Sequence, residues 1–154
     1  MAPGGLLEIL TEAAREEGFP LSGALDLDRV DLRSHVARYD EWLGKGYAGA
    51  MEYLVRGRDR RADPRVVMPE AKSIFCVAIP YPRGAARQRD PSRGPRYARY
   101  LQGPDYHDEL AAKLQRVLAR AAERCRAEGL PELRSKICVD TSAVLERSWA
   151  ALAG

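Results

Sequence analysis

The sequence predicts an α/β fold, a single domain in which a small mixed sheet is flanked by amphipathic helices. The chain has 154 residues, 45% of them hydrophobic and 31% charged, which suits one globular domain with a substantial core. Segments with helical periodicity alternate with two strongly apolar runs that are typical of buried strands. No internal repeat is found, which favours one domain over a repeat array.

The first half of the chain is predicted to form a helix, a strand and two further helices. From Leu6 to Glu17, apolar residues share one helical face and Gly18 is placed to end the helix. Phe19–Leu27 has the pattern of a short strand that closes into an acidic turn. Apolar residues repeat at helical spacing over Leu32–Leu43, and a short helix follows from about Ala50 to Arg56. The apolar face of the first helix consists of Leu6, Leu7, Leu10, Ala13 and Ala14.

The second half is predicted to alternate strands and helices around a long loop. Ser73–Ile79 is rich in β-branched residues and apolar on both faces, which indicates a buried strand. Prolines and glycines interrupt regular structure over residues 81–96, so this segment is predicted to be a loop. A long amphipathic helix is expected over Tyr106–Glu128, followed by a second buried strand at Ile137–Val139 and a last helix over Val144–Ala153.

Composition and cysteine spacing exclude several classes of protein. No apolar run approaches the roughly 18 residues of a membrane span. The first helical segment carries four acids, unlike a secretory leader, so we expect a cytoplasmic protein without a membrane partner. The three cysteines, Cys76, Cys125 and Cys138, show no ligand-type spacing, which argues against a disulfide framework, a metal site or an iron–sulfur cluster within this chain. Cys76 and Cys138 lie in apolar runs and are expected to be inert core residues.

Basic residues are concentrated in the predicted loop, although the net charge of the chain is only +3. This arginine cluster consists of Arg83, Arg87, Arg89, Arg93, Arg96 and Arg99, with Asp90 the one acid among them. Guanidinium groups pair bidentately with phosphates, so nucleic acid or a phosphate-bearing cofactor is a reasonable partner. A solvated loop without a ligand is an equally acceptable interpretation.

Asp140 is the first candidate for chemistry. It follows directly after an apolar strand, at the kind of strand end where α/β folds bind ligands. A partly desolvated carboxyl there could have a raised pKa and donate a proton. The alternative is that Asp140 caps the following turn or helix by accepting hydrogen bonds from backbone N–H groups.

Other polar and aromatic residues of the second half of the chain have similar alternatives. Glu146 and Arg147 could form a buried pair with loop residues, or lie on the wet face of the last helix. Tyrosines beside cations suit flat ligands such as nucleobases or a tetrapyrrole-like ring, or simply pack at a domain surface. These aromatic residues are Tyr97, Tyr100 and Tyr106. His107, at a helix N-terminus, is expected to stay neutral.

Two motifs, Arg99–His107 and Val139–Arg147, resemble signatures of the epoxyqueuosine reductases. Supporting matches occur at Trp42–Met51 and Met68–Ser73, and at the Pro80–Pro82 end of the predicted strand. The likeness therefore extends over nearly the whole chain, 1–154, which resembles the N-terminal cobalamin-binding domain of that family.

The resemblance implies an oxidoreductase of queuosine biosynthesis. In such an enzyme, base-off cobalamin reduces the epoxide of epoxyqueuosine in the tRNA anticodon loop to give queuosine. Electrons arrive through two [4Fe–4S] clusters in a ferredoxin-like domain. By position, Asp140 matches the proton donor to the opened epoxide oxygen. The residues that the resemblance places at the cofactor are Arg61, Ala98, Tyr100, Tyr106, His107, Asp140 and Arg147.

The sequence also departs from the family pattern. The cluster cysteines and the glycine-rich run expected after Gly154 are absent from it. We therefore expect a truncated chain, a monomer that is inactive by itself, with an electron donor that the sequence does not identify. The alternative is a stand-alone module that binds a corrinoid or RNA without redox chemistry, using the arginine cluster.

Overall fold

The structure is a computed structural model that describes residues 5–80 and 105–154. Its two strands, β1 (Leu21–Asp26) and β2 (Ser73–Ala78), form an antiparallel ladder that runs from the Leu21–Ala78 pair to the Asp26–Ser73 pair. The helices of the described residues are α1 (Leu6–Glu16), α2 (Arg33–Gly44), α3 (Glu52–Arg56), α4 (Arg58–Ala62), α5 (Tyr106–Ala127) and α6 (Glu146–Ala153), with a 3₁₀ turn at Pro64–Val66. The α/β class is confirmed.

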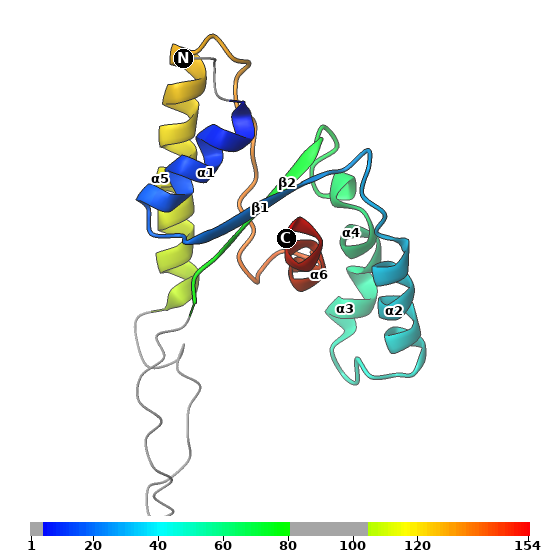
Figure 1. Cartoon of the computed structure of the whole chain (residues 1–154). Helices are drawn as coiled ribbons and strands as arrows, with labels where there is room; N and C mark the ends of the chain where they lie inside the picture. The colour runs from blue at the N-terminus through cyan, green and yellow to red at the C-terminus, as the bar shows by residue number, and fades with distance from the viewer. Residues whose placement is uncertain (1–4, 81–104) are drawn as a thin grey trace, which may run out of the picture.

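Helices cover both faces of the β1–β2 ribbon (Figure 1). Phe75 and Val77 pack against the core between α1 and α5. Successive strand side chains point to opposite faces, so Cys76 points to the other face, where α6 packs on both strands. Directly paired residues share a face, and Gly23, the partner of Cys76, lies against the end of α6 at Ala153.

The core between α1 and α5 agrees with the predicted faces of these helices, with one correction. Ala13, Ala14, Val117 and Ala121 are almost completely buried. By contrast, Leu6 and Leu7, predicted to lie on the buried face of α1, are 40% and 53% exposed. They belong to the first turn of α1, and Ile9 is buried instead, in the core that α1 forms with α5.

Ion pairs reinforce the contact between α1 and α5. Glu17 accepts hydrogen bonds from Arg116 and Arg120 at 2.7 and 2.8 Å, and Arg124 pairs with Glu16 at 2.6 Å. These arginine bonds lower the pKa of Glu17. The acids at the end of α1, which the sequence pattern places on its polar face, therefore connect two helices.

Glycine residues follow the ends of α1 and α5, as predicted. Gly18 has φ +85° and Gly129 has φ +69°, the left-handed conformation that glycine adopts without a side-chain penalty. The following N–H groups of Phe19 and Leu130 then donate back to Ala14 and Cys125 at 2.9 and 2.8 Å. This geometry satisfies the last carbonyls of each helix.

The predicted strand at Ile137–Val139 is not formed, and this prediction was wrong. The segment is partly buried but makes no strand ladder, so the sheet of the described residues has two antiparallel strands rather than a mixed set. An apolar run reports burial of side chains, which does not require backbone pairing. The short helix α4 was missed because its charged residues carry no apolar pattern.

Two further predictions about burial need correction. Cys125 is the fully buried cysteine, whereas Cys76 and Cys138 are only partly buried. Burial nevertheless raises the pKa of the Cys76 thiol, which keeps it protonated.

None of the helices in residues 5–80 and 105–154 has the length and apolar character that crossing a membrane requires.

Candidate active site

Asp140 lies in the loop that leads into α6, and its backbone conformation is unusual. Its φ is +50°, and no other non-glycine residue of the described segments has a positive φ. Aspartate tolerates this region better than most L-residues because its short polar side chain can bond locally. The backbone N–H of Asp140 donates to Oε1 of Glu146 at 2.9 Å. The first residue of α6 therefore holds the loop by a side-chain contact.

The N-terminus of α5 reaches the same carboxylate. The hydroxyl of Tyr106 donates to Oδ2 of Asp140, a contact between residues 34 positions apart. His107 places Nε2 3.8 Å from the same oxygen, and its ring stacks on Tyr106 with centroids 4.1 Å apart. Asp105 caps α5, accepting from the His107 N–H at 2.9 Å, and lies 2.7 Å from Nδ1 of its ring. The two motifs thus meet at one site.

The charge distribution of this site differs from the prediction for Asp140. The Tyr106 hydroxyl, followed by a hydrogen bond with Glu146, lowers the pKa of Asp140. Burial, followed by the hydrogen bond to Asp140, raises the pKa of Glu146 to about 7. The raised pKa that the strand-end position could have given Asp140 is therefore not found, because the side chain is half exposed and accepts hydrogen bonds that favour its ionised form.

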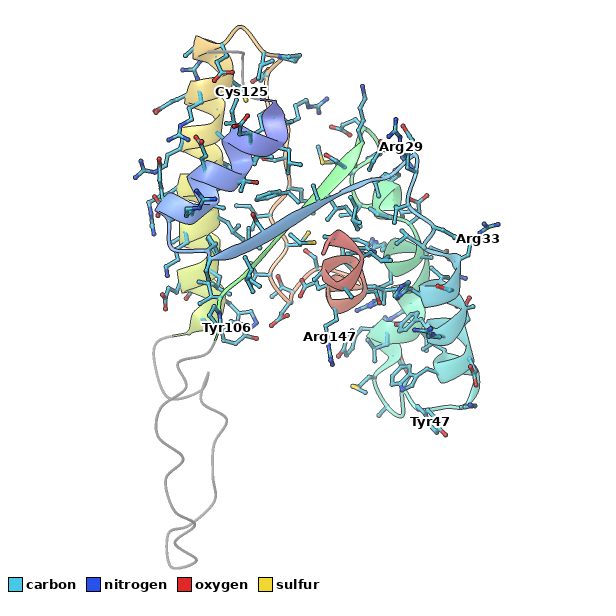
Figure 2. All side chains as sticks on the ribbon, in the orientation of Figure 1. Arg29, Arg33, Tyr47, Tyr106, Cys125 and Arg147 are labelled. Atoms are coloured by element: carbon cyan, nitrogen blue, oxygen red, sulfur yellow. The ribbon has the colours of Figure 1, made fainter. Side chains whose placement is uncertain are left out.

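The alternative role for Asp140, a helix cap, is not observed either. Within the described part of the chain, its carboxylate accepts from Tyr106, and no backbone N–H of α6 donates to it. Glu146 is a partner of this loop, as one of the two alternatives supposed. Arg147 is exposed on α6 (Figure 2).

Arg61 forms a second part of the candidate site. Its guanidinium carbon lies 6.0 Å from the ring centroids of both Tyr39 and Tyr53. Nη1 is buried and has no hydrogen-bond partner among the described residues. A buried donor without an acceptor is costly, so Nη1 stands out as an unsatisfied polar atom of this cluster.

Gly57 joins Arg61 to the loop of Asp140. A Cβ at Gly57 would lie 2.2 Å from Nη1 of Arg61 and 3.4 Å from Cβ of Ala143. The guanidinium therefore packs on bare backbone, and the α3–α4 corner contacts the segment that follows Asp140. Sequence reasoning singled out Arg61 but missed Tyr39, Tyr53 and Gly57, since their relation to it depends on how α2, α3 and α4 fold together.

Several predicted site residues lie outside the described residues. Ala98, Tyr97, Tyr100 and the arginine cluster belong to residues 81–104. In the described segments, no group of three or more histidine, cysteine or acidic side chains could hold a metal ion. The part of the site that can be described thus consists of Arg61, Tyr106, His107, Asp140 and Glu146.

Comparison with known proteins identifies the family. Residues 61–141 match the family model for "Epoxyqueuosine reductase QueG, DUF1730". No solved structure matches the chain.

Curated relatives that carry the name epoxyqueuosine reductase align with nearly all of the chain. That of Gloeobacter violaceus is 37% identical over 92% of this chain and 41% of its own length. That of Prochlorococcus marinus is 36% identical over 97% of this chain and 45% of its own length. That of Cyclobacterium marinum is 31% identical over 96% and 45% respectively. The chain therefore spans less than half the length of these relatives. With more than half of its own residues inside the family model, the chain belongs to the epoxyqueuosine reductase family.

Proposed function

We propose that this chain forms the cobalamin-binding part of an enzyme that reduces the epoxide of epoxyqueuosine in tRNA to queuosine, with Asp140 as proton donor. The hydrogen bond between Tyr106 and Asp140 carries the proposal, since it joins the two motifs in one site. Support also comes from relatives that are named epoxyqueuosine reductase.

The role proposed for Asp140 is the transfer of a proton to an oxygen atom of the substrate. Opening an epoxide leaves an alkoxide, a strong base that needs a proton from a positioned acid. The Asp140 side chain is half exposed, so a substrate oxygen can reach it, while Tyr106 fixes the orientation of its carboxyl group.

The described residues fit a corrinoid in one testable respect. The unpartnered Nη1 of Arg61 is a cationic donor that would suit an amide or phosphate oxygen of cobalamin. The stacked rings of Tyr106 and His107 would offer a flat surface to the corrinoid, and Arg147, exposed on α6, would be a further cationic contact. When bound, cobalamin would supply the strongly reducing centre that breaks the C–O bond.

In the proposal, the electrons come from iron–sulfur clusters outside this chain, and the substrate is a separate tRNA molecule. A [4Fe–4S] cluster uses four cysteine ligands, and the chain has three cysteines, one of them buried between α1 and α5. The two expected clusters are therefore not built from these cysteines. The tRNA would meet the arginine cluster through its phosphates, which predicts binding that weakens with salt.

Cobalamin binding tests the cofactor half of the proposal. In protein expressed from the complete reading frame, Arg61→Ala should weaken cobalamin binding at least about tenfold, measured by absorbance titration. Arg60→Ala, an exposed arginine of the same short helix, is the matched control and should bind as the wild type does. Equal binding by the Arg61 variant would contradict the assigned contact.

A further inference from the structure

The surroundings of Asp140 favour the ionised form of its side chain, so the proton that it transfers needs a source. Tyr106 and Glu146 both bond to its carboxylate and lower its pKa, so the group is ionised near neutral pH. The neighbouring carboxyl, Glu146, has its pKa raised to about 7 by burial and by that ion. Two adjacent carboxyl groups of this kind share one proton, and the higher pKa of Glu146 favours Glu146 as its holder.

The geometry also makes Glu146 the residue that shapes the Asp140 loop. Its Oε1 accepts the Asp140 N–H at 2.9 Å, at the point where φ is +50°. Six positions separate the two residues, so the contact closes the turn between the loop and α6. Trp149, one turn further along α6, is buried and anchors the helix to the sheet.

Resting on the proposed function, we propose that Glu146 is the positioning residue of Asp140 and stores the proton that Asp140 transfers to the opened epoxide oxygen. Glu146 first gives its proton to the ionised Asp140, so the Glu146 O–H bond breaks as the Asp140 O–H bond forms. Asp140 then passes the proton to the alkoxide, and the O–H bond of the product forms as the Asp140 O–H bond breaks. Asp140 is ionised again, and Glu146 is reloaded from water. One solvent proton is therefore consumed for each alkoxide that is quenched, and neither carboxyl group is changed at the end.

The groups around Glu146 are few. His107 of α5 and Asp140 act on its charge, and Cys76 of β2 lies near enough for Glu146 to raise the pKa of that thiol. On β1, Asp26 is the one titratable residue, and it is engaged with Asp28 N–H and Arg29 in its own turn. Of these groups, Asp140 has the hydrogen bond with Glu146 and a larger effect on its pKa than His107, so in the proposal Asp140 is the partner with which Glu146 exchanges a proton.

The titration of Glu146 can be measured without any activity. In protein with ¹³C-labelled side-chain carboxyl groups, the signal that Glu146→Gln removes should titrate near pH 7, and Asp140→Asn should move its midpoint to lower pH. The exposed control Glu132→Gln should leave that signal unchanged. A Glu146 signal that titrates near its ordinary value of 4.5 would overturn the proposal.

The pH profile of turnover separates proton storage from a structural role. Glutamine keeps the oxygen that accepts the Asp140 N–H, so Glu146→Gln should fold and bind cobalamin normally. Its rate should fall about tenfold or more at pH 7, with the descending limb of the profile moved to lower pH. A profile that is scaled down equally at every pH would overturn the storage role.

The two proposals fail in different ways. If Asp140→Asn turns over normally, the proposed function loses its acid whatever Glu146 does. If Asp140→Asn is inactive but Glu146→Gln keeps the wild-type profile, only the present inference is wrong. Glu132→Gln should match the wild type in both measurements.

Discussion

Replacing Gly23 by alanine should disrupt the packing of α6 against the sheet and lower the stability of the domain. A Cβ at this position would lie 2.3 Å from the carbonyl oxygen of Ala153 and 2.9 Å from its carbonyl carbon. Both are backbone atoms, so no side-chain rotation relieves the clash. The end of α6 must move, or β1 must.

The expected cost follows from what that movement disturbs. Overpacking a fitted contact costs about 1–3 kcal/mol. Complete undocking of α6 would expose Trp149, which is 5% exposed in the fold, at a cost of about the same size. For a chain of this length each kcal/mol corresponds to about 2–4 °C in Tm.

Urea unfolding followed by circular dichroism measures the free energy of unfolding directly. The matched control is Gly44→Ala, because a Cβ there meets nothing within 4 Å and the position ends helix α2. That control should be unchanged or stabilised by up to about 1 kcal/mol. A Gly23→Ala protein as stable as the wild type would refute the packing of α6 against β1 described above.

Three further predictions concern titration and the second part of the site. The pKa of Glu146 is about 7 in the folded protein, against an ordinary value of 4.5, so the fold favours the protonated side chain. The stability that this protonated form adds to the fold is fully present below pH 4.5 and is lost as the pH rises through 7. Glu146→Gln should remove this loss, about 1–2 kcal/mol after allowance for solvent exposure, in urea unfolding curves across that range. Glu17 has a lowered pKa, so its contribution is present above 4.5 and lost as the pH falls through the folded pKa. Glu17→Gln should therefore reduce acid destabilisation and the salt sensitivity of unfolding. Gly57→Ala should displace the Arg61 guanidinium, since Nη1 lies 2.2 Å from the new Cβ, and weaken cobalamin binding while Gly44→Ala does not.

The helices that the sequence predicted best are those in which propensity and packing agree. The long pattern of α5 and the glycines after α1 and α5 placed these elements within a residue or two of their observed ends. Helix α2 contains no buried residue, so its apolar spacing marks partial contact rather than a core face. Residues 137–139 were predicted to form a strand because they are apolar, but they are partly buried without pairing to another strand.

The candidate site, too, could be predicted only in part from the sequence. The resemblance to the family pointed to Asp140, Tyr106 and Arg61, but the protonation of the site depends on contacts that no local pattern contains. Glu146 titrates near neutrality because the start of α6 is half-buried next to an ionised Asp140. That environment exists only after α5, the loop and α6 have come together.

The most direct test of the central claim is the conversion of epoxyqueuosine-containing tRNA by the Asp140→Asn variant, in protein expressed from the complete reading frame and loaded with cobalamin. Mass spectrometry of the released nucleosides gives turnover, and visible absorbance gives cobalamin content. The account predicts that this variant retains cobalamin and forms no queuosine above background, while Glu132→Gln matches the wild type. Queuosine formation at the wild-type rate by Asp140→Asn would contradict the account.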